Sequence, residues 1–295
     1  MEVTNADKVM FPDPGYTKAD LVGYYDAVAD RMVPWLDGRP LTLERHPDGV
    51  GTKGFMQKHA SRHFSDRIGR VEVPKSDGTV NHPVVRDRDG LLELANQGTI
   101  TFHVWTAALP DLDRPSHLVL DLDPEAEDLD GVRQVAFAAR DLLDRFDLEG
   151  MPVASGKKGF HIWVPIAGHD YEAAGLAARA MAGLIAAELP DVATVEFRKR
   201  DRAGRVFVDW LRNRRAQSIV CPWSLRTTPL ATVATPLDWE EVAGAMPNGW
   251  TIRSAPRRRQ PDLPAPFRLD LDRIVGRARA AGADLDSEFD RFGRT

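Results

Sequence analysis

The chain has 295 residues, with 39 Lys and Arg against 44 Asp and Glu, and its formal net charge is −5 at pH 7. Hydrophobic and charged fractions of 43% and 28% exclude global disorder, and a single cysteine, Cys221, excludes an intramolecular disulfide and fits a reducing cytosol. No stretch approaches the roughly 18 apolar residues of a membrane span, and the acidic total argues against a nucleic-acid binder.

Hydrophobic spacing predicts helices and strands along most of the chain. Thr17 is typical of a helix N-cap, and apolar residues recur behind it at three- and four-residue spacing, which predicts a helix ending near Gly38. Later predicted strands cover 41–45, 100–105, 117–123, 152–155, 160–164, 195–198, 205–210 and 217–220, and later predicted helices cover 131–148, 171–189 and 268–281.

The order of these elements predicts the fold class. Strands and helices alternate without regular βαβ units, which indicates an α+β fold of mostly antiparallel β-sheets flanked by α-helices. We expect a single domain over residues 1–295, with a core at 1–252. Residues 253–295 are expected to add an extended, Pro- and Arg-rich segment and a C-terminal helix.

The net charge hides a strong segregation of sign. Residues 111–150 contain twelve acidic and four basic residues, a net of −8, whereas residues 197–226 contain nine basic and two acidic residues, a net of +7. A basic segment of this kind can bind a polyanion locally, so the acidic total does not exclude a nucleic-acid enzyme. The alternative is a pair of solvated faces that differ in sign.

Two aspartates at the end of a predicted strand are the strongest sign of chemistry. Alternation places Asp121 and Asp123 on one face of strand 117–123, with Leu120 and Leu122 on the other. Neighbouring carboxylates repel each other, and a hard divalent cation such as Mg²⁺, Mn²⁺ or Ca²⁺ relieves that repulsion. The alternative is an exposed strand end that begins a turn.

A third carboxylate, Asp209, lies within the apolar strand at 205–210. A buried, unpaired aspartate is unfavourable, so Asp209 needs a partner. Shared metal ions with Asp121 and Asp123 would provide one, and three carboxylates with two divalent ions suit displacement at phosphorus. The alternative is a salt bridge from Asp209 to a nearby arginine.

The segment at 155–161, Ser-Gly-Lys-Lys-Gly-Phe-His, could bind an anion. Its glycines allow backbone N–H groups to approach a phosphate, and Ser155, Lys158 and His161 supply donors and charge. Arg212 and Arg226 could clamp a triphosphate through bidentate contacts. The alternative for the segment is a plain β-hairpin turn with solvent-exposed lysines.

Further motifs follow in a fixed order. They are TNADKVMFP at 4–12, GRP at 38–40, FMQKH at 55–59, FHV at 102–104, DLDP at 121–124, SGKKGFH at 155–161, VFVDW at 206–210, PWS at 222–224 and TPLDW at 235–239. With them the chain resembles the archaeo-eukaryotic primase superfamily. Within it, the chain resembles the polymerase domain of bacterial multifunctional DNA-repair (non-homologous end-joining) ligases and their stand-alone primase-polymerase relatives.

The resemblance implies a role for each motif residue. Asp121, Asp123 and Asp209 would be catalytic and would bind two Mn²⁺ or Mg²⁺ ions. Ser155, Lys158, His161, Arg212 and Arg226 would hold the nucleoside triphosphate, and His103 would lie near its sugar and favour ribonucleotides. The DNA contacts would be Lys8 and Lys18 at a 5′-phosphate, Phe55 or Met56 at the template, and Arg202 near the metal site and primer terminus.

One departure bears on the DNA contacts. Where ligase-linked relatives carry a basic residue before Arg45, this chain has Glu44, which predicts a weaker 5′-phosphate pocket.

The resemblance implies a nucleotidyltransferase that extends primers at DNA breaks or short gaps, with a primase-like catalytic core. Its expected partners are gapped or broken DNA, an NTP or dNTP, Ku and a DNA ligase, and its expected location is the bacterial cytoplasm, at the nucleoid, with no membrane. One alternative is a metal-dependent phosphodiesterase or nuclease that uses the same three acids. Another is a non-catalytic DNA-end-binding module that recruits Ku or a ligase.

Overall fold

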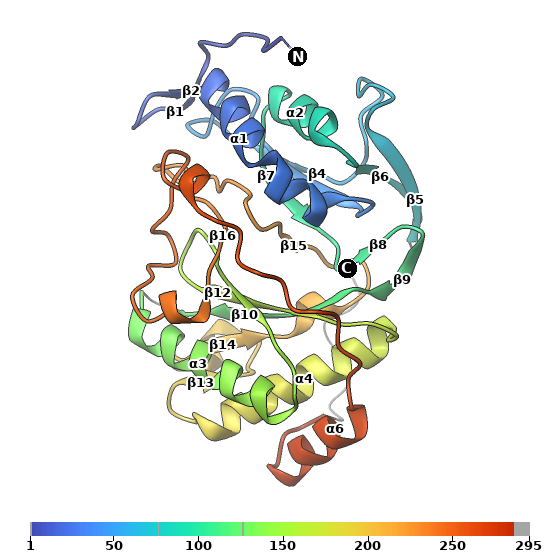
Figure 1. Ribbon diagram of the computed structural model, residues 1–295, viewed down its shortest axis with the longest axis vertical. Coiled ribbons are helices and arrows are strands. Elements are labelled where there is room, and N and C mark those ends of the chain that lie inside the picture. Colours follow the sequence, from blue (N-terminus) through green and yellow to red (C-terminus); the bar gives the residue numbers. More distant parts are fainter. Residues whose placement is uncertain (1, 76, 126, 286–295) are drawn as a thin grey trace.

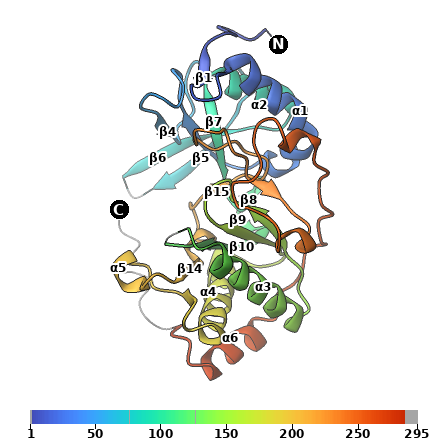
Figure 2. The same ribbon diagram turned by 90° about the vertical axis from the view of Figure 1, so that its left-hand side faces the viewer.

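The computed structural model describes residues 2–75, 77–125 and 127–285, which form a lower and an upper half, each built on a sheet (Figures 1 and 2). The lower half holds a six-stranded sheet in the order β13-β14-β10-β12-β11-β16. Its strands are β10 (His117–Asp123), β11 (Met151–Ala154), β12 (Phe160–Pro165), β13 (Ala193–Thr194), β14 (Val206–Asp209) and β16 (Thr235–Pro236). Only the β13–β14 pair is parallel, so the predicted antiparallel α+β fold is confirmed.

Helices cover one face of this sheet. α3 (Leu129–Arg145) and α4 (Tyr171–Glu188) pack on it, and α6 (Leu271–Ala280) packs on α4 below them (Figure 1). Leu118, Leu120 and Leu122 of β10 point to these helices and are fully buried. Period-two geometry therefore places Asp121 and Asp123 on the opposite face of the sheet, which looks toward the upper half.

The upper half packs helices on a four-stranded sheet in the order β15-β7-β3-β4. Its strands are β3 (Leu41–Arg45), β4 (Phe55–Gln57), β7 (Thr99–Val104) and β15 (Ile219–Val220), and its helices are α1 (Lys18–Leu36) and α2 (Arg88–Asn96). α1 begins with the predicted cap: the Asp20 N–H donates to the Thr17 hydroxyl, and the Thr17 N–H donates to the Asp20 carboxylate. This capping box satisfies two helix-terminal donors.

Short elements complete the chain. Three two-stranded sheets are β1 (Val9–Phe11) with β2 (Tyr16–Thr17), β5 (Gly69–Lys75) with β6 (Gly78–Val84), and β8 (Ala107–Ala108) with β9 (Asp111–Pro115). The remaining helical turns are α5 (Lys199–Arg202), η1 (Leu211–Asn213), η2 (Trp239–Glu241) and η3 (Ala255–Arg257). No helix in the described residues combines the length and the hydropathy needed to cross a membrane.

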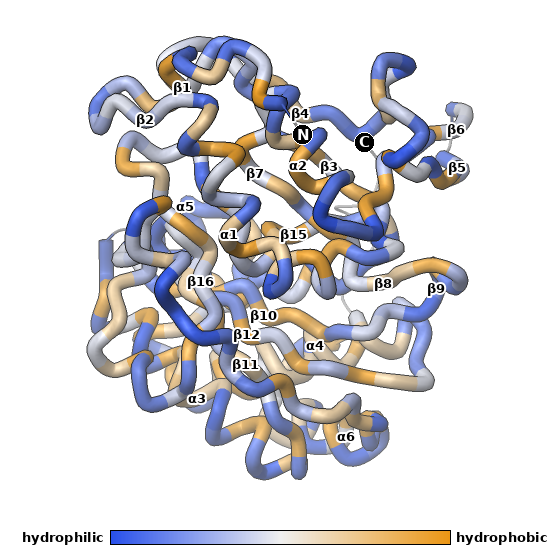
Figure 3. Tube along the Cα trace, turned by 45° about the horizontal axis from the view of Figure 1, so that its top comes forward, coloured by the Kyte–Doolittle hydropathy of each residue, from blue (hydrophilic) through white to orange (hydrophobic). Residues whose placement is uncertain are grey.

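A shared core joins the two halves. Trp163 of β12 and Val119 of β10 lie on the upper face of the large sheet and belong to the same hydrophobic cluster as α1 and α2. The ring of Trp163 packs edge-on against Trp35 of α1, with centroids 5.3 Å apart. Figure 3 shows apolar stretches in the interior at β7 and β10 and hydrophilic stretches mainly at outer turns. The halves are therefore held by apolar packing beside the carboxylate face.

The predicted elements agree with the structure to within three residues, with one error. The strand predicted at 195–198 is wrong. Its carbonyls at Glu196 and Phe197 accept hydrogen bonds of 3.1 and 3.0 Å from the guanidinium of Arg202, so a side chain takes the place of a strand partner. The predictions also omit several short elements, the largest being α2 and the β5–β6 hairpin.

A half-buried histidine at the junction of the halves predicts acid sensitivity. His117 packs on Trp35 and Trp163, and burial, with Arg39 nearby, lowers the pKa of His117 to about 3. The unfolded chain binds this proton at about pH 6.5, so the folded state loses stability as the pH falls below that value. We expect His117 to account for about 2 kcal/mol of unfolding free energy lost between about pH 7.5 and about pH 5.

Urea unfolding of wild type and His117→Gln at both pH values measures this contribution. The unfolding free energy lost between the two pH values should be smaller in His117→Gln than in wild type. In His63→Gln, at an exposed position, this loss should equal that of wild type. An equal loss in His117→Gln and wild type would contradict the assignment.

Candidate active site

Three adjacent strands place three predicted residues in one row. Asp121 of β10 lies directly opposite Asp209 of β14 on one side and His161 of β12 on the other. The imidazole Nε2 of His161 is 3.5 Å from Asp121 Oδ1. The sequence-based expectation that Asp209 faces the Asp121 strand across a sheet is therefore met by the strand register.

An arginine joins the two opposed carboxylates. Arg212 Nε is 3.1 Å from Asp209 Oδ2 and 3.5 Å from Asp121 Oδ2, and the N–H of Leu211 donates to Asp209 Oδ1 at 2.8 Å. Burial and the charge of Asp121 nevertheless raise the pKa of Asp209 to about 6. Burial likewise raises the pKa of Asp121, although Arg212 opposes the shift. The single positive charge of Arg212 thus compensates the two carboxylates of Asp121 and Asp209 only in part.

Asp123 occupies a more open position at the end of β10. Its side chain is 50% exposed, and Oδ2 is 3.3 Å from Nη1 of Arg202. Arg202 is itself buried and lies over the ring of Phe207, 4.1 Å from its centroid. The structure therefore brings Arg202 to the carboxylates, as the resemblance implied.

The donor set of the three aspartates fits a hard divalent cation. Their ligands would be carboxylate oxygens, which Mg²⁺ and Mn²⁺ prefer. Burial raises the pKa values of Asp121 and Asp209, so a cation beside them would stabilise their ionised forms. Within the described residues no three Asp, Glu, His or Cys side chains converge on one point. The carboxylates instead contact Arg212 and Arg202, so the salt bridge considered as the alternative for Asp209 is present.

The 155–161 segment forms a tight turn between β11 and β12. Ser155 Oγ accepts hydrogen bonds of 3.2 Å from the N–H groups of both Lys157 and Gly159. Gly156 adopts a φ of +73°, and a Cβ on Gly159 would lie 1.8 Å from the carbonyl oxygen of Leu122. Both glycines are required, because the turn packs directly against the strand that carries the aspartates.

Positive charge gathers beside this turn. Arg226 is half-buried and donates from Nη1 to the Ser155 carbonyl at 3.0 Å, while its Nε has no hydrogen-bond partner in the described structure. Burial, together with Arg226 and Arg212, lowers the pKa of His161 to about 3, so the imidazole is neutral near pH 7. Burial also lowers the pKa of Lys157.

These groups line one pocket of about 690 Å³. The predicted residues in its wall are Asp121, Asp123, Ser155, Lys158, His161, Arg212 and Arg226. Lys157, Thr228 and Asn248 line it as well and were not predicted. Asp209 and His103 do not line the pocket, and Asp209 is reached through Arg212.

His103 and Glu44 lie on neighbouring strands of the upper sheet. Burial and the charge of Arg226 lower the pKa of His103 to about 4. Glu44 Oε1 accepts a hydrogen bond of 2.9 Å from the hydroxyl of Thr227, the residue after Arg226. Glu44 therefore lies beside the segment that carries Arg226, and the weaker 5′-phosphate pocket expected from Glu44 stays a prediction.

Lys8 and Lys18 lie together near the start of α1. Lys8 Nζ is 2.9 Å from Asp48 Oδ1, and Lys18 Nζ donates to the Thr4 hydroxyl at 2.8 Å. Burial and the nearby Lys8 lower the pKa of Lys18. The two lysines form a small cationic site separate from the carboxylate pocket, which they do not line.

The predicted template-stacking residues are exposed. Phe55 and Met56 of β4 have 48% and 54% of their surface accessible. The guanidinium of Arg45 lies 5.5 Å from the ring centroid of Phe55. Both side chains are thus accessible from solvent, and stacking of either one on a template base stays a prediction.

Asn213 is a site residue that the sequence did not reveal. Its side-chain amide accepts from the Val119 N–H at 2.7 Å and donates to the Val119 carbonyl at 2.6 Å, as a strand residue would. This contact attaches η1, and with it Arg212, to β10 two residues before Asp121. No sequence pattern could identify it, because the partner is backbone 94 residues away.

A comparison with solved structures gives the class of the protein. The chain matches the "Polymerase Domain from Mycobacterium tuberculosis Ligase D in complex with DNA" with a TM-score of 0.78 and 32% sequence identity. The match covers 97% of this chain and 96% of the other. The fold is therefore that of a DNA-repair polymerase domain.

Sequence comparisons give the family. The family described as "LigD, primase-polymerase domain" matches residues 17–266. The "Multifunctional non-homologous end joining protein LigD" of Mycolicibacterium smegmatis is 35% identical over 247 residues, and the "Bifunctional non-homologous end joining protein LigD" of Bacillus subtilis is 32% identical over 250. These matches cover 82% and 83% of this chain but 32% and 40% of the relatives. The chain belongs to the LigD primase-polymerase domain family.

Removal of the Asn213 amide should weaken the edge of β10. In Asn213→Ala the Val119 N–H and C=O lose their partners in a buried position, and we expect a loss of about 1–3 kcal/mol of unfolding free energy for each unpaired group. Amide exchange at Val119 should also become faster. Urea unfolding and hydrogen exchange measure both effects.

Gln134→Ala, on the exposed side of α3, serves as the control and should unfold as wild type. Unchanged stability and exchange in Asn213→Ala would mean that η1 is held by other contacts.

Proposed function

We propose that the chain is a template-directed nucleotidyltransferase that extends primers at DNA breaks or short gaps. One observation carries the proposal: carboxylates suited to metal ions and a cationic turn suited to phosphates line the same 690 Å³ pocket. The family relationship supports it, because the relatives are named non-homologous end joining proteins. A nuclease would use the carboxylates but would have no need of a triphosphate site.

In this proposal the turn and the arginines bind the triphosphate. Lys158 reaches the pocket from the turn, and Arg226 presents an unpaired Nε beside it. Charge-assisted hydrogen bonds from such groups hold phosphates and neutralise charge that develops on them. His161 is neutral near pH 7, so it would act as a hydrogen-bond donor or acceptor and not as a charge.

Asp121, Asp123 and Asp209 would hold two Mn²⁺ or Mg²⁺ ions. Bound there, the metals would supply Lewis-acid activation of a primer hydroxyl and stabilise the leaving pyrophosphate. The protein's contribution is to hold the carboxylates ready: strand pairing fixes Asp121 opposite Asp209, and Arg212 keeps both oriented until positive charge arrives. Arg202 would steady Asp123 at the primer side.

The remaining assignments concern the sugar, the DNA and the partners. We propose that His103 lies near the sugar and favours ribonucleotides, and that Phe55 or Met56 stacks on the template. Gapped or broken DNA, Ku and a DNA ligase would be the partners, at the bacterial nucleoid. We also propose that residues 1–295 act as one domain with a 1–252 core, which the packing of α6 on α4 supports.

Nucleotide incorporation separates a polymerase from a nuclease. We expect Lys158→Ala to lower kcat/KM for the triphosphate by about 10- to 100-fold, because one charge-assisted phosphate contact is lost. Asp121→Ala should abolish incorporation while DNA binding remains. Primer extension on a one-nucleotide gap with Mn²⁺ or Mg²⁺, with ribo- and deoxyribonucleotides in parallel, measures each effect.

Lys75→Ala, in an exposed surface ion pair of the β5–β6 hairpin, is the matched control and should extend as wild type. Normal extension by Asp121→Ala would refute the metal assignment. Phosphodiester cleavage by wild type that is insensitive to Lys158→Ala would favour the nuclease.

The lysine pair near α1 should give the enzyme a preference for a 5′-phosphate. We expect wild type to bind a gap with a 5′-phosphate about tenfold more tightly than one without, and Lys8→Ala to lose most of this ratio. Fluorescence anisotropy with the two DNAs measures it, and Lys75→Ala should keep the wild-type ratio. Equal affinity of wild type for both DNAs would exclude a 5′-phosphate site at Lys8 and Lys18.

A further inference from the structure

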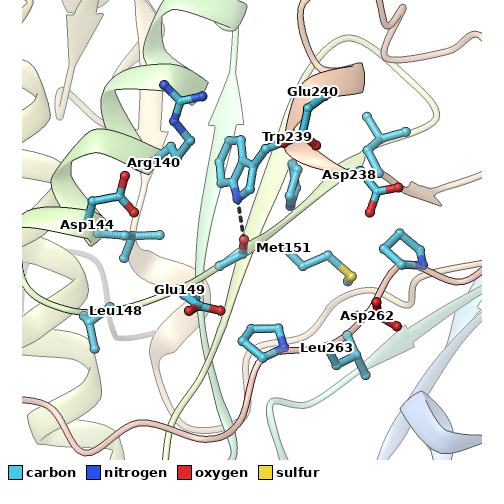
Figure 4. A pocket seen from close by; sticks show the side chains of 16 residues that line it. Arg140, Asp144, Leu148, Glu149, Met151, Asp238, Trp239, Glu240, Asp262 and Leu263 are labelled. Carbon is cyan, nitrogen blue, oxygen red and sulfur yellow. Dashed lines mark hydrogen bonds between the residues drawn. The ribbon is translucent and has the colours of Figure 1, made fainter.

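A second recess opens on the lower half, between α3, the loop before β11, η2 and the extended segment 261–264 (Figure 4). Its volume is about 340 Å³, and it shares no lining residue with the carboxylate pocket. An occupant of this recess would therefore leave the nucleotide and the metal ligands accessible.

The floor of the recess is apolar. Leu143, Met151 and Trp239 contribute to it, and Leu263 at its margin is 50% exposed. The indole N–H of Trp239 donates to the Gly150 carbonyl at 2.7 Å, the bond drawn in Figure 4. This bond satisfies the one polar atom of the ring and fixes its orientation. The recess therefore offers a preformed apolar surface.

The rim of the recess is acidic. Five carboxylates line it: Asp144, Glu149, Asp238, Glu240 and Asp262. Arg259 pairs with Asp238 at 2.9 Å and with Asp262 at 3.8 Å.

Three of the five rim carboxylates are uncompensated. Asp144, Glu149 and Glu240 have no ion-pair partner in the described part of the chain. Arg140, the one cationic side chain of the lining, pairs at 2.9 Å with Asp141 on its own helix.

Charge and shape together define the occupant. Nucleic acid is a polyanion and would be repelled by this rim, so the recess is not part of a DNA interface. A cation alone would leave the apolar floor unused. A lysine or arginine next to an aliphatic side chain would suit both the acidic rim and the apolar floor. The cationic group would lie at the rim and the aliphatic side chain on the floor, and Trp239 would be available for a cation–π contact.

We propose that this recess is a docking site for an extended segment of a partner protein that carries basic residues beside an aliphatic anchor. The inference does not rest on the polymerase activity, because the site is separate from the catalytic pocket. The size of the recess suits a few side chains of a peptide and not the face of a folded domain.

A displayed library of random dodecapeptides tests the proposal with the full chain as bait. Peptides are selected on wild type and counter-selected on the double variant Glu149→Lys/Glu240→Lys. Both positions are exposed, so the substitutions should leave the fold intact, which the urea unfolding midpoint verifies. We expect the retained peptides to carry Lys or Arg next to Leu, Ile or Met. Failure to retain any, or retention of neutral or acidic peptides, would overturn the proposal.

The affinity of a retained peptide, measured by fluorescence anisotropy, completes the test. We expect the double variant to bind it at least about tenfold more weakly than wild type, because two rim charges are reversed. Asp191→Lys, a charge reversal at an exposed position away from the recess, should bind as wild type. Replacing the aliphatic anchor by glycine should weaken binding to a similar extent. An equal loss of affinity in Asp191→Lys would show that the effect is general electrostatics. That result, or an unchanged affinity of the peptide with glycine at the anchor, would overturn the proposed site.

Discussion

The opposition of two carboxylates on neighbouring strands constrains the whole lower half of the molecule. Asp121 and Asp209 share a row of the sheet, and burial with mutual repulsion makes their ionised forms unfavourable. Strand pairing alone cannot hold such a pair, so a cation must be positioned within reach. Arg212 meets this need, and Asn213 fixes Arg212 by pairing with the Val119 backbone where β14 no longer covers β10.

The same constraint bears on the position of the turn at residues 155–161. The triphosphate site that we propose would need positive charge near the carboxylates of Asp121 and Asp209. It would need that charge without a second fully charged group buried beside them. The turn reaches β10 because Gly159 has no side chain to strike Leu122, and Arg226 is tied to it through the Ser155 carbonyl. His161, between the turn and Asp121, stays neutral near pH 7 because burial, and then the charges of Arg226 and Arg212, lower its pKa to about 3. The carboxylates and the cationic groups therefore line the same open pocket.

Sequence reasoning reached the residues whose positions follow from strand periodicity. Asp121, Asp123 and Asp209 stand in apolar strands, where an acid is conspicuous, and the alternation fixes their face. Sequence reasoning failed where a side chain, and not a neighbouring strand, forms hydrogen bonds with the backbone. Arg202 binds the carbonyls of the predicted 195–198 strand, and Asn213 acts as a strand residue without being in one. The Asn213 contact joins residues 94 apart, whereas the Arg202 contacts close a loop of five and six residues, and neither follows the period of a strand or a helix.

The structure also changes the meaning of the basic segment at 197–226. Its net charge of +7 suggested a strip that grips DNA, yet several of its arginines are already engaged. Arg202 and Arg212 contact the carboxylates of Asp121, Asp123 and Asp209, Arg226 donates to the Ser155 carbonyl, and Arg215 pairs with Asp113 at 2.6 Å. Three ion pairs, Arg202–Asp123, Arg212–Asp121 and Arg215–Asp113, join the −8 and +7 segments within the fold. These arginines are therefore engaged within the fold, and fewer charges than the sequence counts remain for a nucleic-acid partner.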